Sequence, residues 1–255
     1  MKVVILAGGF GSRLCEETFN KPKALVKIGT QPIIWHIMNY YSHFGLNEFV
    51  IALGYNGQCL RNWVKSFKNF KQKTILKNDL LEVDSVSFTG NEHAEWFVHM
   101  VDTGLNTQTG GRIKRLAPII GDETFMLTFC DGLSDVNLRS LLNFHRSHGR
   151  LATVTAVRPQ SRFGHLILKG NRVLHFEEKP RLDWINGAFC VFEPGVLDYI
   201  EDDTTNLTKD SLKKLADAGE LMAFRHNGFW QCMDNMSEKV LLEKIWNKGK
   251  APWKK

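Results

Sequence analysis

The residues best suited to chemistry lie near the start of the chain. Three glycines, in the stretch Gly8-Gly9-Phe10-Gly11, follow the apolar run 3–7, and the cations Arg13, Lys21 and Lys23 come next. Glycine lets a backbone approach a phosphate closely, and guanidinium and ammonium groups balance its charge. The stretch LAGGFGSRL…KPKAL therefore predicts a phosphate-binding loop, and the phosphates could be those of a cofactor or of a substrate.

The glycine loop departs from two common phosphate-binding motifs. A dinucleotide-binding fold has G-x-G-x-x-G and an acidic residue about 20 positions later. Here the third glycine is missing, and Lys21 and Lys23 follow instead. The P-loop pattern G-x-x-x-x-G-K-[ST] is also absent. A dinucleotide oxidoreductase is therefore disfavoured, and a tight turn before a helix is the structural alternative to phosphate binding.

Two aspartates follow predicted strands. Asp131 comes after the apolar run 125–129, and Asp234 follows Trp230 and Met233 in a second apolar segment. Ligands bind at the carboxyl ends of strands in open α/β sheets. Two carboxylates there can share a magnesium ion that bridges phosphate oxygens. An isolated Asp-Gly pair is more often a turn, so this interpretation needs independent support.

The elements that must position these residues alternate between strand and helix. The runs 3–7 and 49–53 are apolar throughout, as in buried parallel strands. Residues 32–44, between them, place apolar side chains at helical spacing, and this order predicts a right-handed parallel crossover. Further strands are expected at 125–129, 151–157 and 221–224, further helices at 59–67, 135–147, 207–218 and 237–246, an inserted hairpin at about 70–100, and antiparallel strands carrying a pocket at 163–192.

Composition excludes several classes of protein. The 255 residues are 43% hydrophobic, which supports a large core, and the +6 charge is spread along the chain rather than clustered as in nucleic-acid-binding proteins. No apolar run approaches the ~20 residues of a membrane span. Five scattered cysteines predict reduced thiols in a cytoplasmic protein. His145 and His148 lie three apart without a third ligand, so a surface or capping role is expected.

Several segments together resemble a known family. LAGGFGSRL, KPKALVKIG and QPIIWHI resemble the opening of the sugar-phosphate nucleotidyltransferases, whose usual form is L-A-G-G-x-G-[ST]-R-L followed by K-P-K-P. The resemblance runs almost end to end and is closest to the bacterial glucose-1-phosphate cytidylyltransferases. The other matching segments are VDTGLNTQTGGRIKR (101–115), DGLSDVN (131–137), RFGHL (162–166), EEKP (177–180), GELMAFRHNGFWQCMD (219–234) and GKAPWK (249–254).

The resemblance implies a fold and a reaction. The fold would be an α/β, Rossmann-like, mixed and mainly parallel sheet flanked by helices, with a small inserted β element. Residues 1–255 would form one domain, with an extension at about 70–100, an acceptor-binding part at about 160–235, and a C-terminal helix and tail at 235–255. The reaction would be magnesium-dependent transfer of CMP from CTP to a phosphorylated small molecule, by default glucose 1-phosphate, releasing pyrophosphate. We expect a homo-oligomer that binds neither nucleic acid nor membrane.

The resemblance also assigns site residues. Arg13 would grip the triphosphate, Lys23 would stabilise the transition state, and Asp131 and Asp234 would bind Mg²⁺; these four are the expected catalytic residues. Lys21 is either their partner or a solvated lysine. The expected nucleotide-binding residues are Leu6, Ala7, Gly8, Gly9, Phe10, Gly11, Ser12, Arg13, Lys23, Thr109, Gly111 and Asp131. The expected acceptor-binding residues are Gly164, Glu178, Lys179 and Asn186.

The chain departs from the family pattern mainly on the acceptor side. Ala24 replaces the second proline of K-P-K-P, and Cys130 stands where glycine is usual. The loop 181–185 is short, and residues 207–211 replace an acidic, proline-containing stretch. A different acceptor, including a non-sugar phosphate, therefore stays open. A nucleotide-binding regulatory subunit without turnover is the alternative from another class, although Arg13, Lys23, Asp131 and Asp234 are all retained.

Overall fold

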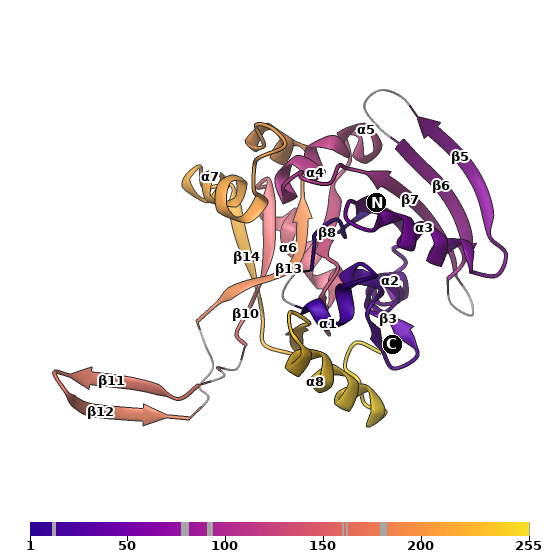
Figure 1. The fold of residues 1–255 in the computed structure, drawn as a ribbon. Helices are drawn as coiled ribbons and strands as arrows, with labels where there is room; N and C mark the ends of the chain where they lie inside the picture. Colours follow the sequence, from indigo (N-terminus) through magenta and orange to yellow (C-terminus); the bar gives the residue numbers. More distant parts are fainter. Residues whose placement is uncertain are drawn as a thin grey trace.

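A nine-stranded sheet forms the middle of the molecule (Figure 1). The computed structural model describes residues 1–11, 14–77, 82–90, 94–159, 161, 163–178 and 183–254. In spatial order the strands are β14 (Leu221–His226), β10 (Ala152–Val157), β13 (Ile185–Phe192), β8 (Phe125–Phe129), β1 (Val3–Leu6), β4 (Glu48–Leu53), β7 (Glu95–Asp102), β6 (Glu82–Thr89) and β5 (Lys71–Lys77).

The central strands of this sheet are parallel. Val3 of β1 lies opposite Phe49 of β4 on one side and Met126 of β8 on the other. All four residues of β1 are buried, as expected for an apolar strand covered on both faces. β13 interrupts the parallel order, and β6 and β5 extend it as antiparallel strands. The expected mixed, mainly parallel α/β fold is confirmed.

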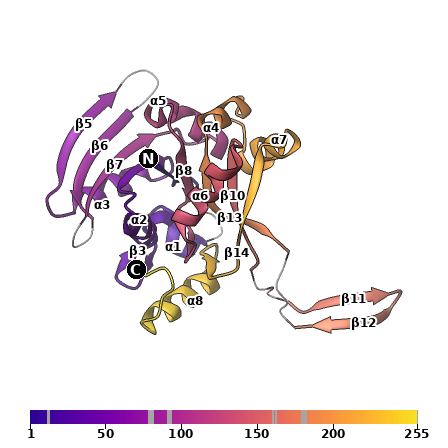
Figure 2. The same ribbon diagram turned by 180° about the vertical axis from the view of Figure 1, so that it is seen from behind.

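Helices cover both faces of the sheet (Figure 2). Side chains alternate along β1, so Val3 and Ile5 belong to one buried cluster and Val4 and Leu6 to the other. The first cluster includes residues of α2 (Ile33–His43), α3 (Gly57–Lys65), α6 (Leu138–His148) and α8 (Met236–Asn247). The second includes residues of α4 (Thr109–Arg115), α5 (Ala117–Ile120), η3 (Pro194–Tyr199), η4 (Leu207–Ser211) and α7 (Leu212–Asp217).

Short elements complete the fold at one edge of the sheet. Helix α1 (Cys15–Thr18) and the 3-10 turn η2 (Lys23–Leu25) follow the glycine loop, and the strand pair β2 (Lys27–Ile28) and β3 (Gln31–Pro32) precedes α2. A separate ladder joins β9 (Gly132–Ser134) to β15 (Trp230–Cys232). None of the described helices has the length and apolarity needed to span a bilayer.

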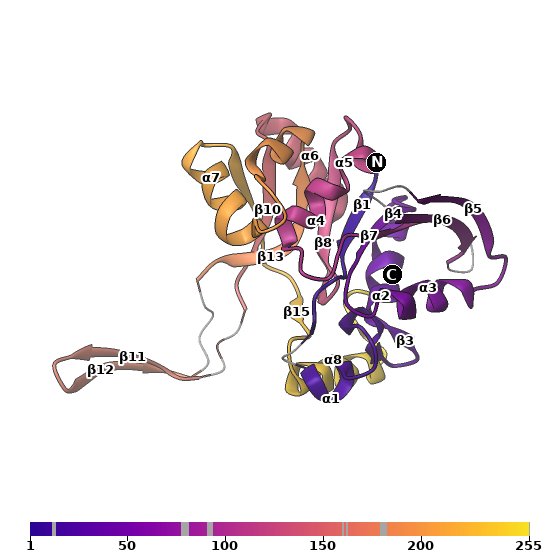
Figure 3. The ribbon, with the colours of Figure 1, turned by 45° about the horizontal axis from the view of Figure 1, so that its top comes forward.

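A two-stranded hairpin projects away from the body as an arm (Figures 1 and 3). It consists of β11 (His165–Lys169) and β12 (Arg172–Glu177), and every residue of both strands is exposed. Antiparallel strands were expected within 163–192, and they occur as this arm and as β13. The arm does not form a pocket wall, because none of its residues lines the pocket described below.

A histidine network fastens α6 to the sheet. The expected surface or capping role of His145 was wrong, because His145 is 1% exposed. Its ring nitrogens lie 2.8 Å from the Thr153 hydroxyl and 3.0 Å from a Glu193 carboxylate oxygen. His148 reaches the same hydroxyl at 2.7 Å. Its second ring nitrogen accepts the Arg150 amide. The ring nitrogens of the pair therefore serve as hydrogen-bond partners of polar groups between α6 and the sheet.

Candidate active site

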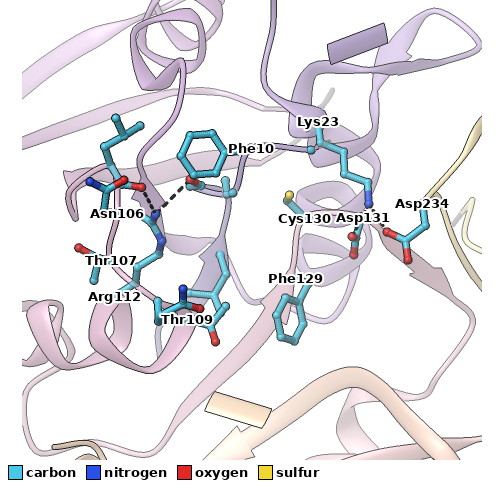
Figure 4. A pocket seen from close by; sticks show the side chains of 17 residues that line it. Phe10, Lys23, Asn106, Thr107, Thr109, Arg112, Phe129, Cys130, Asp131 and Asp234 are labelled. Atoms are coloured by element: carbon cyan, nitrogen blue, oxygen red, sulfur yellow. Dashed lines mark hydrogen bonds and ion pairs between the residues drawn. The ribbon is translucent and has the colours of Figure 1, made fainter. Parts of the chain in front are cut away.

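A pocket of about 430 Å³ opens at the carboxyl ends of the parallel strands (Figure 4). It lies where β1, β8 and β7 end, which is the edge that open α/β sheets use for ligands. Its lining residues are Leu6, Ala7, Gly8, Gly9, Phe10, Gly11, Lys23, Leu105, Asn106, Thr107, Gln108, Thr109, Arg112, Phe129, Cys130, Asp131 and Asp234.

The glycine loop is fixed to the neighbouring strand end. The Ala7 amide donates to Ala52 O at 3.1 Å, and the Tyr55 amide donates to Gly8 O at 3.2 Å. Gly11 has a φ of +64°, in the region that favours glycine, and the Thr18 hydroxyl donates to its carbonyl at 3.0 Å. The loop therefore leaves β1 as a held turn whose residues 8–11 all line the pocket.

Lys23 and two aspartates converge at one end of the pocket (Figure 4). The Lys23 ammonium is 2.7 Å from Asp131 Oδ2 and 2.6 Å from Asp234 Oδ1. Burial acts to lower the pKa of Lys23, but attraction from the two carboxylates outweighs it and raises this pKa overall. The three side chains therefore form one charged cluster with a net negative charge.

The β9–β15 ladder brings the two aspartates together. Asp131 immediately precedes β9, and Asp234 follows β15 after Met233. The Met233 amide donates to Asp131 O at 2.9 Å, which extends the ladder to the aspartates themselves. At the other end, Asp135 Oδ1 accepts the Phe229 amide at 2.7 Å. The His226 ring lies 2.9 Å from the same oxygen.

The start of α8 holds Asp234 from the other side. Asn235 caps this helix by accepting the Glu238 amide at 3.1 Å, as N-cap residues do. Glu238 Oε2 in turn accepts the Asp234 amide at 2.6 Å. Both the backbone before Asp234 and the backbone after it are therefore tied to regular structure.

Lys21 has a different environment from Lys23. Its ammonium lies 2.9 Å from Glu17 Oε2, and Lys239 of α8 reaches the other oxygen of Glu17 at 2.8 Å. Hydrogen bonds from Lys21 and Lys239 lower the pKa of Glu17 to about 2. Lys21 does not line the pocket, so it belongs to a bridge between α1 and α8.

Cys130 is an unreactive wall of the pocket. Burial, together with the Asp131 charge, raises the pKa of its thiol to about 12. The thiolate, which is the nucleophilic form, is therefore suppressed at neutral pH. The four cysteines with described side chains, Cys59, Cys130, Cys190 and Cys232, are all free.

The donor set fits a hard divalent cation. Two carboxylates already share one cationic partner, the Lys23 ammonium, so their oxygens converge on a common volume. No group of three or more His, Cys, Asp or Glu side chains within the described ranges could hold a metal alone. Two carboxylates completed by waters and substrate phosphates are the ligands that magnesium takes in nucleotide enzymes.

The expected acceptor residues are not gathered in the pocket. Gly164 and Glu178 flank the arm strands, and a side chain at Gly164 would come within 2.6 Å of the Phe176 ring. Asn186 is the second residue of β13, three residues before the Phe189–Thr128 pair, so it lies at the same sheet edge as Asp131. Its side chain accepts the Ala188 amide at 2.9 Å. Lys179 lies outside the described residues.

Most of the residues expected to bind the nucleotide lie together in the pocket. Leu6 to Gly11, Lys23, Thr109 and Asp131 all line the pocket. Ser12 and Arg13 lie outside the described residues. Gly111 does not line the pocket; it packs against the Asp203 backbone, where a side chain would come within 2.5 Å of Asp203 Cα. Thr109 and Gly111, the two residues expected here, both belong to the first turn of helix α4.

Sequence reasoning missed the pocket wall formed by residues 105–108. These residues follow β7, a strand of the parallel set that was expected only as part of an inserted hairpin. The signal was available, because a polar run after a buried strand is where a parallel sheet places its ligand loops. Because β7 was expected to be a hairpin strand, the loop after it was not considered as a ligand loop.

The fold and the pocket together are those of an enzyme that handles nucleotides. The family of nucleotidyl transferases matches residues 2–234, and the chain belongs to this family. Proteins of this family typically use a divalent metal ion.

Individual relatives narrow the comparison. The chain is 44% identical to the glucose-1-phosphate cytidylyltransferase of Salmonella typhimurium, over 100% of this chain and 99% of the relative. It is 32% identical to mannose-1-phosphate guanylyltransferase 1 of Arabidopsis thaliana, over 90% of this chain and 60% of the relative. Among solved structures, HddC from Yersinia pseudotuberculosis superposes with a TM-score of 0.71 at 19% identity, covering 96% and 99% of the two chains. The last likeness concerns the fold alone.

Proposed function

We propose that the protein transfers CMP from CTP to glucose 1-phosphate and releases pyrophosphate. One observation carries this proposal. The glycine loop, Lys23 and the carboxylates of Asp131 and Asp234 meet in a single pocket of a chain that matches a glucose-1-phosphate cytidylyltransferase over its whole length. A non-catalytic regulatory subunit would have no use for that charged cluster.

In the proposed reaction, a phosphate oxygen of the acceptor forms a bond to the α-phosphorus of CTP. The bond from that phosphorus to the bridging oxygen breaks, and pyrophosphate leaves with the electron pair. The pocket contributes position and charge rather than covalent chemistry. Backbone amides of the glycine loop would bind the triphosphate, Arg13 would grip it, and the Lys23 ammonium would balance charge at the α-phosphate.

Magnesium is the divalent cation that we propose for this site. Asp131 and Asp234 would hold it, because they offer hard oxygen donors and leave positions for waters and phosphate oxygens. When bound, it would neutralise charge on the phosphates and orient them.

The acceptor would lie on the side of the pocket toward β13. Asn186 lies at the same sheet edge as Asp131, and Gly164 and Glu178 flank the strands of the arm. The arm points away from the body of the chain. The proposed acceptor side would therefore be completed only when another surface packs against the arm.

We propose that this surface belongs to a second copy of the chain, so that the protein is a homo-oligomer. Leu166 pairs with Phe176 and Leu168 pairs with Val173 on the arm, so these four share one face. Each is about half exposed. An isolated two-stranded hairpin is marginal in water, and a contiguous apolar face marks an interaction site. We also propose that the chain forms a single domain. A cytoplasmic location is proposed as well, and the free thiols of the described cysteines support it.

A matrix of substrates tests the proposed reaction. CTP, UTP, dTTP and GTP are each combined with glucose 1-phosphate, mannose 1-phosphate and a non-sugar phosphate such as phosphocholine, with and without magnesium. Pyrophosphate release is expected to be highest with CTP, glucose 1-phosphate and magnesium. Asp131→Asn provides the background. Turnover with another base, or with no acceptor, would overturn the proposal.

A different phosphorylated acceptor is the second candidate. The observation in its favour is that Gly164 and Glu178 do not line the pocket, so the acceptor side is the less constrained half of the site. The same matrix decides between the two, because a preference for CTP combined with another acceptor would identify it.

A further inference from the structure

The most heavily hydrogen-bonded side chain in the pocket wall has no place in the proposed chemistry. Arg112 of α4 is 4% exposed, yet five acceptors lie within hydrogen-bond distance of its two terminal nitrogens, three of them sharing the two hydrogens of Nη1. Four of the acceptors are main-chain carbonyls and the fifth is the Thr103 hydroxyl. Burying a guanidinium is costly unless each donor is used, so this side chain is held in one orientation.

The five acceptors belong to three separate loops. Nη1 donates to Leu53 O at the end of β4, at 3.0 Å, and to Gly104 O after β7, at 2.7 Å. Nη2 donates to Gly8 O in the glycine loop, at 3.1 Å, and to Leu105 O, at 3.2 Å. Figure 4 shows the guanidinium between the Asn106 segment and the segment that carries Phe10. Arg112 therefore joins the glycine loop to the loop 103–108.

The backbone is shaped to admit this side chain. A Cβ at Gly8 would collide with Nη1 of Arg112, and a Cβ at Gly54 would lie 2.6 Å from the same nitrogen. Neither glycine has a positive φ, so space rather than backbone conformation requires glycine here. Two glycines in different loops are thus fitted to one arginine.

The direction of these carbonyls also determines the direction of the amides that follow them. In a planar trans peptide the C=O and the following N–H point in opposite directions. Because the carbonyls of Gly8, Gly104 and Leu105 point at Arg112, the amides of Gly9, Leu105 and Asn106 point away from it. Within the described ranges these three amides have no protein acceptor, and all three residues line the pocket.

We infer that Arg112 is a positioning residue for the nucleotide, orienting backbone donors of two loops at once. The inference rests on the proposed function. The Gly9 amide is set to bind a phosphate oxygen, and the Leu105 and Asn106 amides are set to bind acceptor atoms of the base or ribose. Arg112 itself acts through these peptides rather than through the reacting atoms. A purely apolar brace would hold α4 equally well but would not fix the peptide planes.

Arg115 provides the matched control. It lies one turn further along α4, and its guanidinium pairs with the Asp203 carboxylate, with Nε 2.8 Å from Oδ1. It does not line the pocket. The Arg115 guanidinium lies near Gly104, where a Cβ would come within 3.2 Å of Nη1, but its hydrogen bonds go to Asp203 rather than to the loop carbonyls. Arg115→Lys therefore removes a guanidinium from the same helix without removing the hydrogen bonds that Arg112 makes to the two loops.

The test compares substrate affinities of Arg112→Lys, Arg112→Met and Arg115→Lys. Wild-type turnover of CTP is established first, since its absence would reject the proposed function rather than this inference. For Arg112→Lys we expect a rise of at least tenfold in the KM and Kd for CTP, and in the Kd for tripolyphosphate. The KM for the acceptor and kcat should change less than twofold, because the lost interactions are uniform binding.

The thermal midpoints separate positioning from folding. If Arg112→Met proves unstable, Arg112→Lys, which keeps the charge, carries the test. Arg115→Lys should match the wild type in both nucleotide constants. Unchanged CTP affinity in a folded Arg112→Lys would overturn the inference. An equal loss for CTP and the acceptor, or the same loss in Arg115→Lys, would also overturn it and assign Arg112 a merely structural role.

Discussion

The nucleotide side and the acceptor side of the site are constructed in different ways. On the proposed nucleotide side, the ends of β1 and β8 and the segments that follow β7 and β15 meet in one pocket, and hydrogen bonds from Arg112 and the β9–β15 ladder hold its walls. On the acceptor side, Gly164 and Glu178 border an arm whose strands are wholly exposed. The proposed nucleotide half is thus gathered in one pocket, and the residues of the proposed acceptor half are not. This difference predicts that a substitution in one half should impair the function of that half and leave the other half unchanged.

The largest effect is expected from the charged cluster. Lys23→Met, Asp131→Asn and Asp234→Asn should each lower kcat by about 10²-fold or more, the scale typical of losing one preorganised charge stabiliser. The thermal midpoint should change little in Asp131→Asn, whose side chain is partly exposed. Lys21→Met is the control, since Lys21 pairs with Glu17 outside the pocket. Near-normal pyrophosphate release from both aspartate variants would refute their assignment as metal ligands.

The next largest effect concerns the arm. Leu168→Asp combined with Phe176→Asp places charges on its apolar face and should dissociate the oligomer, as measured by sedimentation. Acceptor-dependent turnover should fall by about tenfold or more, as hot-spot truncations at interfaces do. The Kd for CTP should stay within twofold of the wild type. Phe97→Asp, an exposed apolar residue on β7, is the control. A monomeric wild type would remove the basis of this prediction.

A smaller loss is expected when the ladder is loosened. Asp135→Asn keeps the shape of the side chain but weakens its charge-assisted bond to the Phe229 amide and its pairing with His226. That change should misplace Asp234 slightly and lower kcat by about tenfold, since charge-assisted hydrogen bonds contribute ~1.5–3 kcal/mol. An increase in the magnesium concentration needed for half-maximal rate should accompany it. An unchanged magnesium dependence would show that the ladder does not need Asp135.

The histidine network of His145 and His148 lies outside the pocket, so a change there should lower stability without changing activity toward either substrate. Thr153→Val leaves ring nitrogens of His145 and His148 without their hydroxyl partner. Unfolding in urea should show a loss of about 1–3 kcal/mol, the usual penalty for buried unsatisfied groups. The kcat/KM of folded protein should match the wild type for both substrates. Thr204→Val, an exposed threonine on a loop, serves as the comparison.

The smallest effect is a dependence of stability on pH at the bridge between α1 and α8. The pKa of Glu17 is lowered in the folded protein, so its stabilisation is present above about 4.5 and is lost as the pH falls toward about 2. Glu17→Gln should therefore have a slightly lower thermal midpoint at pH 7. The two midpoints should converge as the pH is lowered from 4.5 toward 2. A constant gap would contradict the lowered pKa.

Sequence reasoning succeeded where a local pattern determines the structure. The apolar run 3–7 forms a buried strand and its continuation as expected, and Leu6, Ala7, the glycines that follow and Lys23 line the pocket. The convergence of Asp131 and Asp234 came from family resemblance, because no local pattern indicates a three-residue ladder between distant segments. The burial of His145 and the hydrogen bonds of the Arg112 guanidinium escaped detection for the same reason, because the partners of both side chains lie on other elements.

The exposed arm shows a second limit. Alternating apolar residues in 163–192 correctly predicted antiparallel strands, but alternation indicates a face that is covered, not which surface covers it. β13 and the arm share that pattern. One is buried in the main sheet, and the other stands outside it.

The β9–β15 ladder also has a consequence for folding. Lys23 and Asp234 are separated by 211 residues, so the charged cluster is among the contacts of longest range in the chain. Closing such a loop is paid for in chain entropy before the contact is made, and long-range pairing forms slowly. During refolding, burial of the parallel strands should precede catalytic competence. Ribosome-bound chains that lack the segment after residue 229 would carry a formed nucleotide loop without its second carboxylate.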